Sequence, residues 1–209
     1  MSKLSRFFLL AGLVCVVAGP LRADVLNFDD ITTSGGVPDN AAIPASYHGF
    51  TFAGSWYVVN NAFYNSYYGD SVTFPSSLNS AFNGFQASPL SLAGTPFSFD
   101  GASFASFVYS NQQLGPPFSG TFVTVNGYLG GSLMGTAAMN LASNGSFSFL
   151  TVGPGFGDVD TLDVTSNGFW LMDNFTYGAA AVPEPSSLLL LGTGLLGLGL
   201  LARCRIRLV

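Results

Sequence analysis

The sequence predicts an all-β domain, an antiparallel two-sheet sandwich of the jelly-roll type, flanked by an N-terminal signal helix and a C-terminal transmembrane helix. Aromatic and β-branched residues are abundant between the two ends, and the chain has 20 Phe and 8 Tyr in 209 residues. Turn-forming Gly, Pro, Asn and Ser interrupt them about every 8 to 12 residues, and no stretch keeps a helical period. Residues 146–149 and 169–177 instead alternate with a period of two, as half-buried strands do.

The first element is a secretory signal peptide, residues 1–23. Lys3 and Arg6 supply its charged start, and an apolar run follows over residues 7–18. We expect signal peptidase to cut after Ala23, with a cut after residue 18 or 19 as the alternative. The chain is therefore expected to be exported.

The exported domain is expected to cover residues 24–178 and to have a single core. Asn144-Gly145 suits a tight turn, because both central residues of a type I′ turn need positive φ. We expect residues 143–145 to close a hairpin, and Asn126-Gly127 suits a second turn of this kind. Strands are expected at residues 25–31, 49–59, 70–74, 96–109, 119–128, 132–142, 145–152, 158–165 and 168–178.

The C-terminal end has three parts in a fixed order. Residues 179–187 form a linker with a Pro-Glu-Pro turn, residues 188–202 an apolar transmembrane helix, and residues 203–209 a basic tail. Such a helix is roughly 22 Å long, a short span for a bilayer core of about 30 Å. The basic tail should stay in the cytoplasm. The motif residues are Pro183, Glu184, Pro185, Arg203, Arg205 and Arg207.

This tail resembles the PEP-CTERM sorting signal of Gram-negative bacteria over its whole length. The resemblance implies that the precursor is held at the inner membrane until an exosortase cuts near the Pro-Glu-Pro. It also implies a final location at the cell surface or in the extracellular matrix, because such proteins accompany extracellular polysaccharide and biofilm. An ordinary C-terminal anchor that is never cleaved is the alternative interpretation.

The charge distribution excludes nucleic acid as a partner. All six Lys and Arg residues lie at the two ends, so residues 23–202 contain none, while the same range holds all 11 acidic residues. Binding of phosphates requires clustered Lys or Arg. The aspartates of the domain are left with water, backbone amides, cations or His48 as partners. Both cysteines also lie outside the domain, so no disulfide is expected within it.

The first and last strands are predicted to hold a structural calcium ion. Asp173 falls on an otherwise apolar face of the last strand, and an unpaired buried carboxylate is very costly. The two strands resemble those of carbohydrate-binding sandwiches, in which they lie side by side and often hold calcium, an ion that takes six to eight oxygen ligands. The alternative is that these residues cap strand ends or bond backbone amides. The expected ligands are Asp29, Asp30, Asp173 and Asn174.

Residues 60–70 form the most distinctive loop of the predicted domain. Tyr64, Tyr67 and Tyr68 stand there among Asn, Ser and Gly, a mixture that suits binding loops. Tyrosine rings also suit the apolar faces of sugars. The alternative is a plain loop whose rings fold back over the core.

Catalysis is not expected from this composition. The domain has no Lys, Arg or Cys, and no G-x-S-x-G elbow presents a serine to His48. We expect a non-catalytic exported protein of the extracellular polysaccharide or biofilm matrix. The first alternative is a carbohydrate-binding module that uses the Tyr-rich loop. The second is an Asp-based polysaccharide hydrolase, because a spatial pair of carboxylates cannot be seen in a sequence.

Overall fold

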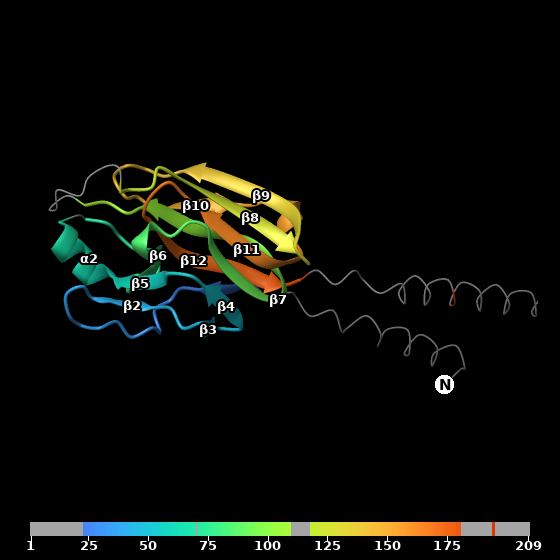
Figure 1. Cartoon of the computed structure of the whole chain (residues 1–209), viewed down its shortest axis with the longest axis horizontal. Helices are drawn as coiled ribbons and strands as arrows, with labels where there is room; N and C mark the ends of the chain where they lie inside the picture. The colour runs from blue at the N-terminus through green and yellow to red at the C-terminus, as the bar shows by residue number, and fades with distance from the viewer. Residues whose placement is uncertain (1–22, 70, 110–117, 181–193, 195–209) are drawn as a thin grey trace, which may run out of the picture.

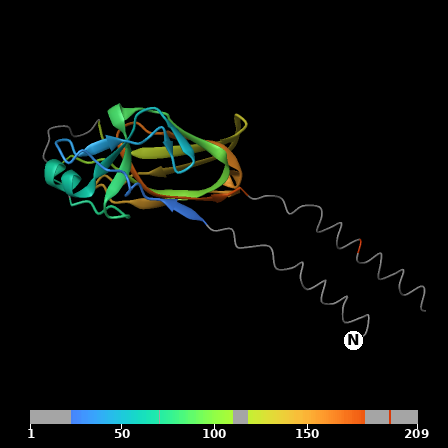
Figure 2. The same cartoon turned by 90° about the horizontal axis from the view of Figure 1, so that it is seen from below.

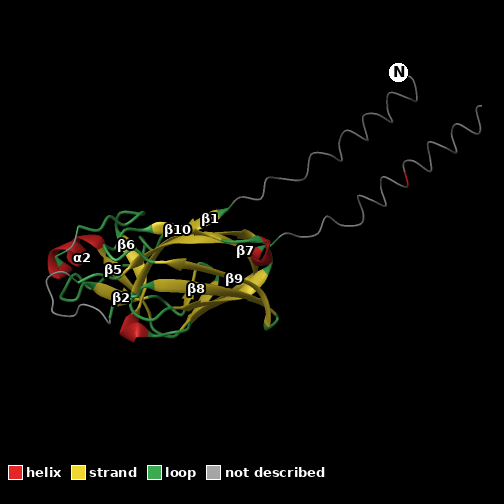
Figure 3. Ribbon diagram, turned by 90° about the horizontal axis from the view of Figure 1, so that it is seen from above, coloured by secondary structure: helices red, strands yellow, loops and turns green. Residues whose placement is uncertain are grey.

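The computed structural model describes residues 23–69, 71–109, 118–180 and 194. Within residues 23–180 the described chain is all-β, with one α-helix and two short 3-10 turns (Figures 1 and 3). The elements are β1 (Asp24–Leu26), β2 (Asn40–Ala42), β3 (Ser46–Tyr47), β4 (Phe50–Ala53), β5 (Trp56–Asn60), α2 (Asn61–Tyr68), β6 (Asn79–Asn83), η2 (Gly84–Gln86), β7 (Leu90–Ser106), β8 (Phe122–Leu129), β9 (Ser132–Asn140), β10 (Ser148–Thr151), η3 (Pro154–Phe156), β11 (Val159–Thr165) and β12 (Trp170–Ala179).

The strands are hydrogen-bonded into one large sheet, and the long strand β7 is its connector. The main path of the sheet is β2-β5-β6-β12-β7-β11-β8-β9. The first part of β7 pairs with β4 and β11, and its later part pairs with β10 and β12. Because one strand changes neighbours along its length, the sheet curls around the core (Figure 2). The all-β prediction is confirmed, whereas two separate sheets and a jelly roll are not.

Two hydrophobic clusters lie on opposite faces of this sheet. The main core, inside the curl, contains Trp56 and Trp170, whose rings meet at 5.5 Å between centroids. The second cluster contains Leu171 of β12 and Tyr64 of α2, so the helix covers the outer face of the sheet at that point. β12 is consequently buried on both faces over its first four residues. The sequence pattern predicted a half-buried strand, with one face exposed.

Helix α2 occupies the segment for which the sequence predicted a loop. Asn60 caps its start, since the Oδ1 atom accepts hydrogen bonds from the N–H groups of Ala62 at 3.0 Å and Phe63 at 3.2 Å. Gly69 ends it in the left-handed conformation, with φ 78°. Tyr64 is buried in the second cluster and anchors the helix. The loop prediction was wrong, because Asn60 and Gly69 are the caps of a helix.

Several predicted strands differ from those observed, three of them for clear local reasons, and β2, β3 and β6 lie in segments for which no strand was expected. β1 ends at Leu26, because Phe28 has a φ of 62° that breaks the extended chain. The strand expected at 49–59 is divided into β4 and β5 by Gly54, which has a φ of 98°. The strand expected at 70–74 is wrong over its described part, 71–74: the backbone N–H and C=O of Val72 bond the side-chain amide of Asn65 instead of a neighbouring strand.

The structure also differs from the prediction at the two Asn-Gly pairs. Asn126 and Gly127 lie inside β8, and the chain turns at Gly130 and the residue after it, where φ is positive. Gly145 does lie in a turn, with φ 73°. The strands on either side of that turn, β9 and β10, pair with β8 and β7 rather than with each other. The predicted hairpin is therefore wrong, although its turn is real.

The first and last strands lie side by side, as the sequence predicted. β1 pairs antiparallel with β12, and Asp24 stands opposite Tyr177. Both ends of the domain, residues 23 and 180, therefore lie at one end of the molecule, opposite α2 (Figure 1). The predicted signal helix, the Pro-Glu-Pro linker beyond residue 180, the helix at 188–202 and the basic tail fall outside the described residues, apart from residues 23 and 194.

Candidate functional site

The candidate site lies where the chain leaves β1 and crosses the end of β6. Asp173 of β12 is fully buried there. A β-bulge follows it in the pairing of β12 with β7, and Asn174 takes a left-handed φ of 49°. This bend brings the N–H of Asn174 to 2.6 Å from Asp173 Oδ1. The bulge therefore fixes the direction of the buried carboxylate.

Ser76 joins this carboxylate to the segment after β1. Its N–H and its hydroxyl both lie 2.9 Å from Asp173 Oδ2. The same hydroxyl oxygen lies 3.0 Å from Asp29 Oδ1, 3.2 Å from the carbonyl oxygen of Asn79 and 3.3 Å from that of Asn27. We call these five residues the acidic junction.

The donor set of the acidic junction fits a hard cation. A hydroxyl has one proton and can donate to one acceptor at a time, yet four acceptor oxygens surround Ser76 Oγ. Two of these acceptors belong to carboxylates and two to backbone carbonyls, the oxygen types that calcium takes. No Lys or Arg occurs in the described residues to neutralise the carboxylates. No group of three or more His, Cys, Asp or Glu residues occurs there either, so a cation would depend on carbonyl and hydroxyl ligands.

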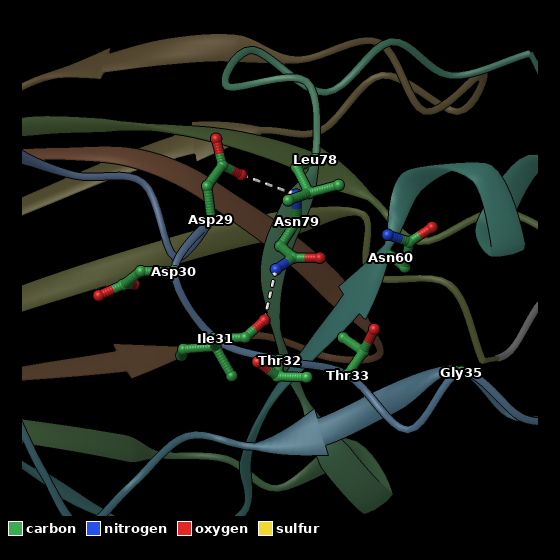
Figure 4. Close-up of a pocket in the computed structure, with 9 residues that line it drawn as sticks. All are labelled: Asp29, Asp30, Ile31, Thr32, Thr33, Gly35, Asn60, Leu78 and Asn79. Atoms are coloured by element: carbon green, nitrogen blue, oxygen red, sulfur yellow. Dashed lines mark hydrogen bonds between the residues drawn. The ribbon is translucent and has the colours of Figure 1, made fainter.

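The structure brings two of the four sequence-predicted ligands together. Asp29 and Asp173 meet through Ser76, and the Asp29 carboxylate also accepts the N–H of Asn79 at 2.8 Å (Figure 4). Asn174 takes part through its backbone N–H. Asp30 does not join the group, because its carboxylate bonds the residue pair described below. Ser76 was missed, since a serine in a loop gives no sequence signal of this role.

Asp30 pairs with the neighbouring segment of the chain. Its carboxylate accepts a short hydrogen bond from the hydroxyl of Tyr47 and lies 2.9 Å from Nε2 of His48. The bond from Tyr47 and then that from His48 lower the pKa of Asp30 below its usual value. Burial, followed by the bond to Asp30, raises the pKa of Tyr47.

Burial sets the protonation of Asp173. Desolvation raises its pKa from 3.8 to about 6, although hydrogen bonds from Ser76 and Asn174 partly offset this effect. The negative charge of Asp29 raises it further. A bound cation would oppose both effects, because it favours the ionised carboxylate. The Asp173 carboxyl group therefore ionises at a higher pH than an exposed aspartate does, at about pH 6.

The predicted tyrosines divide into a core residue and a surface pair. Tyr64 is buried, and its hydroxyl bonds the backbone of Val108, so it is not available as a sugar platform. Tyr67 is 38% exposed, and Tyr68 is partly buried. The two rings meet edge to face at 5.1 Å between centroids. A pocket of about 420 Å³ beside them is lined by Pro38, Tyr67, Tyr68, Gln86, Tyr109, Phe118 and Phe169.

The sorting residues, from Pro183 to Arg207, lie outside the described residues. Among the residues that are described, no helix combines the length and the apolar character needed to cross a membrane. The described domain is all-β, and Asp29 after its first strand meets Asp173 of its last strand through Ser76.

A comparison with known protein families identifies the C-terminal segment. The family model described as the PEP-CTERM protein-sorting motif matches residues 181–206, so the resemblance seen in the sequence is confirmed. The chain carries the sorting signal of a PEP-CTERM protein, which implies exosortase processing of an exported, membrane-anchored precursor. No curated protein matches the chain.

One solved structure is similar in fold, a DUF4465 family protein from Bacteroides caccae. The TM-score is 0.50 with 14% sequence identity, and the alignment covers 75% of this chain and 98% of that chain. This similarity concerns the fold alone. It supports the all-β architecture and carries no information on function.

Proposed function

We propose that the protein is a non-catalytic component of the extracellular polysaccharide or biofilm matrix, released there after exosortase processing. The observation that carries this proposal is the sorting motif at residues 181–206, which follows an acidic all-β domain. A domain without Lys or Arg does not adhere to anionic surfaces by charge. It is suited to remain soluble among neutral polysaccharides.

The experiment is to locate the protein in wild-type cells and in cells that lack the exosortase. In the wild type we expect a processed form in the matrix fraction, and mass spectrometry should show that residues 188–209 have been removed. In the deletion strain the precursor should stay in the inner membrane. A full-length C-terminus on protein recovered from the matrix would contradict exosortase processing. Processed protein confined to the periplasm would contradict the matrix role.

We also propose that calcium stabilises the domain at the acidic junction. Asp29 and Asp173 would supply carboxylate oxygens, Ser76 its hydroxyl, and Asn27 and Asn79 their backbone carbonyls. These residues come from the segment after β1, from β6 and the loop before it, and from β12. An ion there would tie together parts of the chain that are far apart in sequence, which is a structural rather than a catalytic role.

Carbohydrate binding at the aromatic pocket is the second candidate function. The observation in its favour is that Tyr67 and Tyr68 share a pocket with three further rings, those of Tyr109, Phe118 and Phe169. A glycan array is the direct test, with Tyr67→Ala as the pocket variant. Phe149→Ala is a matched control, because Phe149 is an exposed aromatic residue of β10 that does not line the pocket. Loss of binding in the first variant alone is expected.

An Asp-based polysaccharide hydrolase is the remaining alternative. Release of reducing ends from polysaccharides by the purified protein would favour it over both binding roles. Asp29 and Asp173, which meet at the acidic junction, would be the first residues to replace. We expect no turnover, because Asp173 is fully buried and holds its hydrogen bonds within the protein.

A further inference from the structure

A second, polar pocket lies beside the acidic junction. It has a volume of about 300 Å³ and is bounded by the segment after β1 and by the adjoining ends of β5 and β6 (Figure 4). Asn60 of β5 and Asn79 of β6 are paired across the two strands, so their side chains are close neighbours. Thr33 and Asp29 line the pocket from the segment after β1, and Leu78 adds an apolar, half-exposed wall.

A buried acceptor without a partner among the described residues lies beside this pocket. Asn79 is 1% exposed, and its Nδ2 group donates to the carbonyls of Phe28 at 3.1 Å and Ile31 at 2.9 Å. These two acceptors fix the orientation of the amide, because the reverse orientation would set oxygen against oxygen. Oδ1 then has no partner among the described residues. Figure 4 shows this oxygen turned away from Ile31 and toward the side of Asn60.

The other groups of the pocket define the kind of ligand. The Oδ1 atom of Asn60 caps α2, so its Nδ2 group remains as a donor with no bond among the described residues. Thr33 adds a hydroxyl, and the carboxylate of Asp29 lines the pocket, although its Oδ1 atom already accepts hydrogen bonds from Ser76 and Asn79. The second carboxylate of the pocket, that of Asp30, is already engaged by Tyr47 and His48. The ligand must therefore donate to Asn79, accept from Asn60, and cover an apolar wall.

The charge of the domain further restricts the chemical class of the ligand. No Lys or Arg occurs anywhere in residues 23–202, so a phosphate or an acidic sugar would meet only acidic and neutral groups. A neutral ligand rich in hydroxyl groups fits, since each hydroxyl can both donate and accept. The volume of about 300 Å³ limits the occupant to about one sugar ring and its water.

We propose that this pocket binds a single neutral sugar unit, with a hydroxyl of the sugar donating to Asn79 Oδ1. The proposal rests on the proposed function, for which it names a ligand class and a site. It is distinct from the aromatic pocket, with which it shares no lining residue. Asn79 belongs to both the polar pocket and the acidic junction. Occupancy of the pocket should therefore stabilise the segment after β1.

The test is an NMR titration of the exported domain with glucose, galactose, mannose and N-acetylglucosamine, and with glucuronate as a separate acidic probe, at a constant concentration of calcium chloride. At least one neutral sugar should bind saturably and shift the side-chain amide signals of Asn79 and Asn60. Thr33→Val removes one hydroxyl with little change in volume and should weaken binding about tenfold, the effect of one hydrogen bond. Thr151→Val is the matched control, because Thr151 is an exposed threonine of β10 outside the pocket.

Several outcomes would overturn the proposal. These are no saturable binding of any neutral sugar, equal affinity of wild type and Thr33→Val, or tighter binding of glucuronate. Asn79→Ala is avoided, because it would leave the carbonyls of Phe28 and Ile31 unpaired and could prevent folding. Sugar binding that fails in Tyr67→Ala but not in Thr33→Val would assign the ligand to the aromatic pocket. Failure of the polar pocket leaves the matrix location, tested by fractionation, unaffected.

Discussion

Replacing Asp173 by Asn should remove a pH-dependent loss of stability from the metal-free protein. The folded pKa of Asp173 is raised from 3.8 to about 6 by burial, so the folded state binds its proton more tightly than the unfolded state does. The contribution of this proton to stability is fully present below pH 3.8 and is lost as the pH rises to about 6. Above that value the loss should level off.

The magnitude follows from the same two values. A difference between 3.8 and about 6 corresponds to about 3 kcal/mol of unfolding free energy, at about 1.4 kcal/mol per pKa unit. Asparagine keeps the shape of the side chain but carries no charge at any of these values. Because part of this difference is already lost at pH 4, the stability of Asp173→Asn relative to wild type should improve by about 2.4 kcal/mol between pH 4 and pH 7. Asp30 has the opposite effect on stability, because its lowered pKa adds stability that is lost as the pH falls. This effect is the same in wild type and in Asp173→Asn, so it cancels when the two stabilities are subtracted.

The assay is urea unfolding of chelator-treated protein at several pH values, repeated with calcium. With calcium at one hundred times its dissociation constant, wild type at pH 7 should gain about 2.7 kcal/mol, and Asp173→Asn should gain much less. Asp158→Ala, which alters an aspartate outside the acidic junction, should respond to calcium as wild type does. A stability difference between wild type and Asp173→Asn that does not change from pH 4 to pH 7 would refute the raised pKa. A wild type indifferent to calcium would remove the metal site and leave Asp173 as a hydrogen-bonded structural residue.

Three further predictions concern processing, protease cleavage and the helix anchor. Glu184→Ala should trap a precursor at the inner membrane, which immunoblots of membrane fractions would show; normal release would mean that the tail acts as a plain anchor. Trypsin should leave residues 23–202 intact even in urea, because that range has no Lys or Arg, and an internal cut seen by mass spectrometry would contradict this. Tyr64→Phe should lower the unfolding free energy by about 1 to 3 kcal/mol, because the buried N–H and C=O of Val108 lose the hydroxyl between them. Urea unfolding measures this loss, and an unchanged midpoint would show that the hydroxyl does not anchor α2.

The sequence by itself determined the sorting signal, the charge and the β character of the domain. The signal is a contiguous pattern of residue types, and the family model matches the same segment, 181–206. The absence of Lys and Arg from residues 23–202 is a matter of counting. Asp173 stood out because a carboxylate on an apolar strand face needs partners. The pairing of β1 with β12 also agreed with the prediction.

Only the tertiary structure decided which residues meet. Ser76 and the carbonyl of Asn79 join Asp29 and Asp173 through contacts that span up to 97 residues, and no local pattern encodes such contacts. Asp30 lies apart from Asp29 and Asp173, because the positive φ at Phe28 ends β1 early, and its carboxylate bonds Tyr47 and His48. Tyr64 resembled a surface tyrosine in the sequence, and its burial depends on a sheet face that only the fold assembles. Local composition specifies local conformation, whereas a site between distant strands depends on the packing that brings them together.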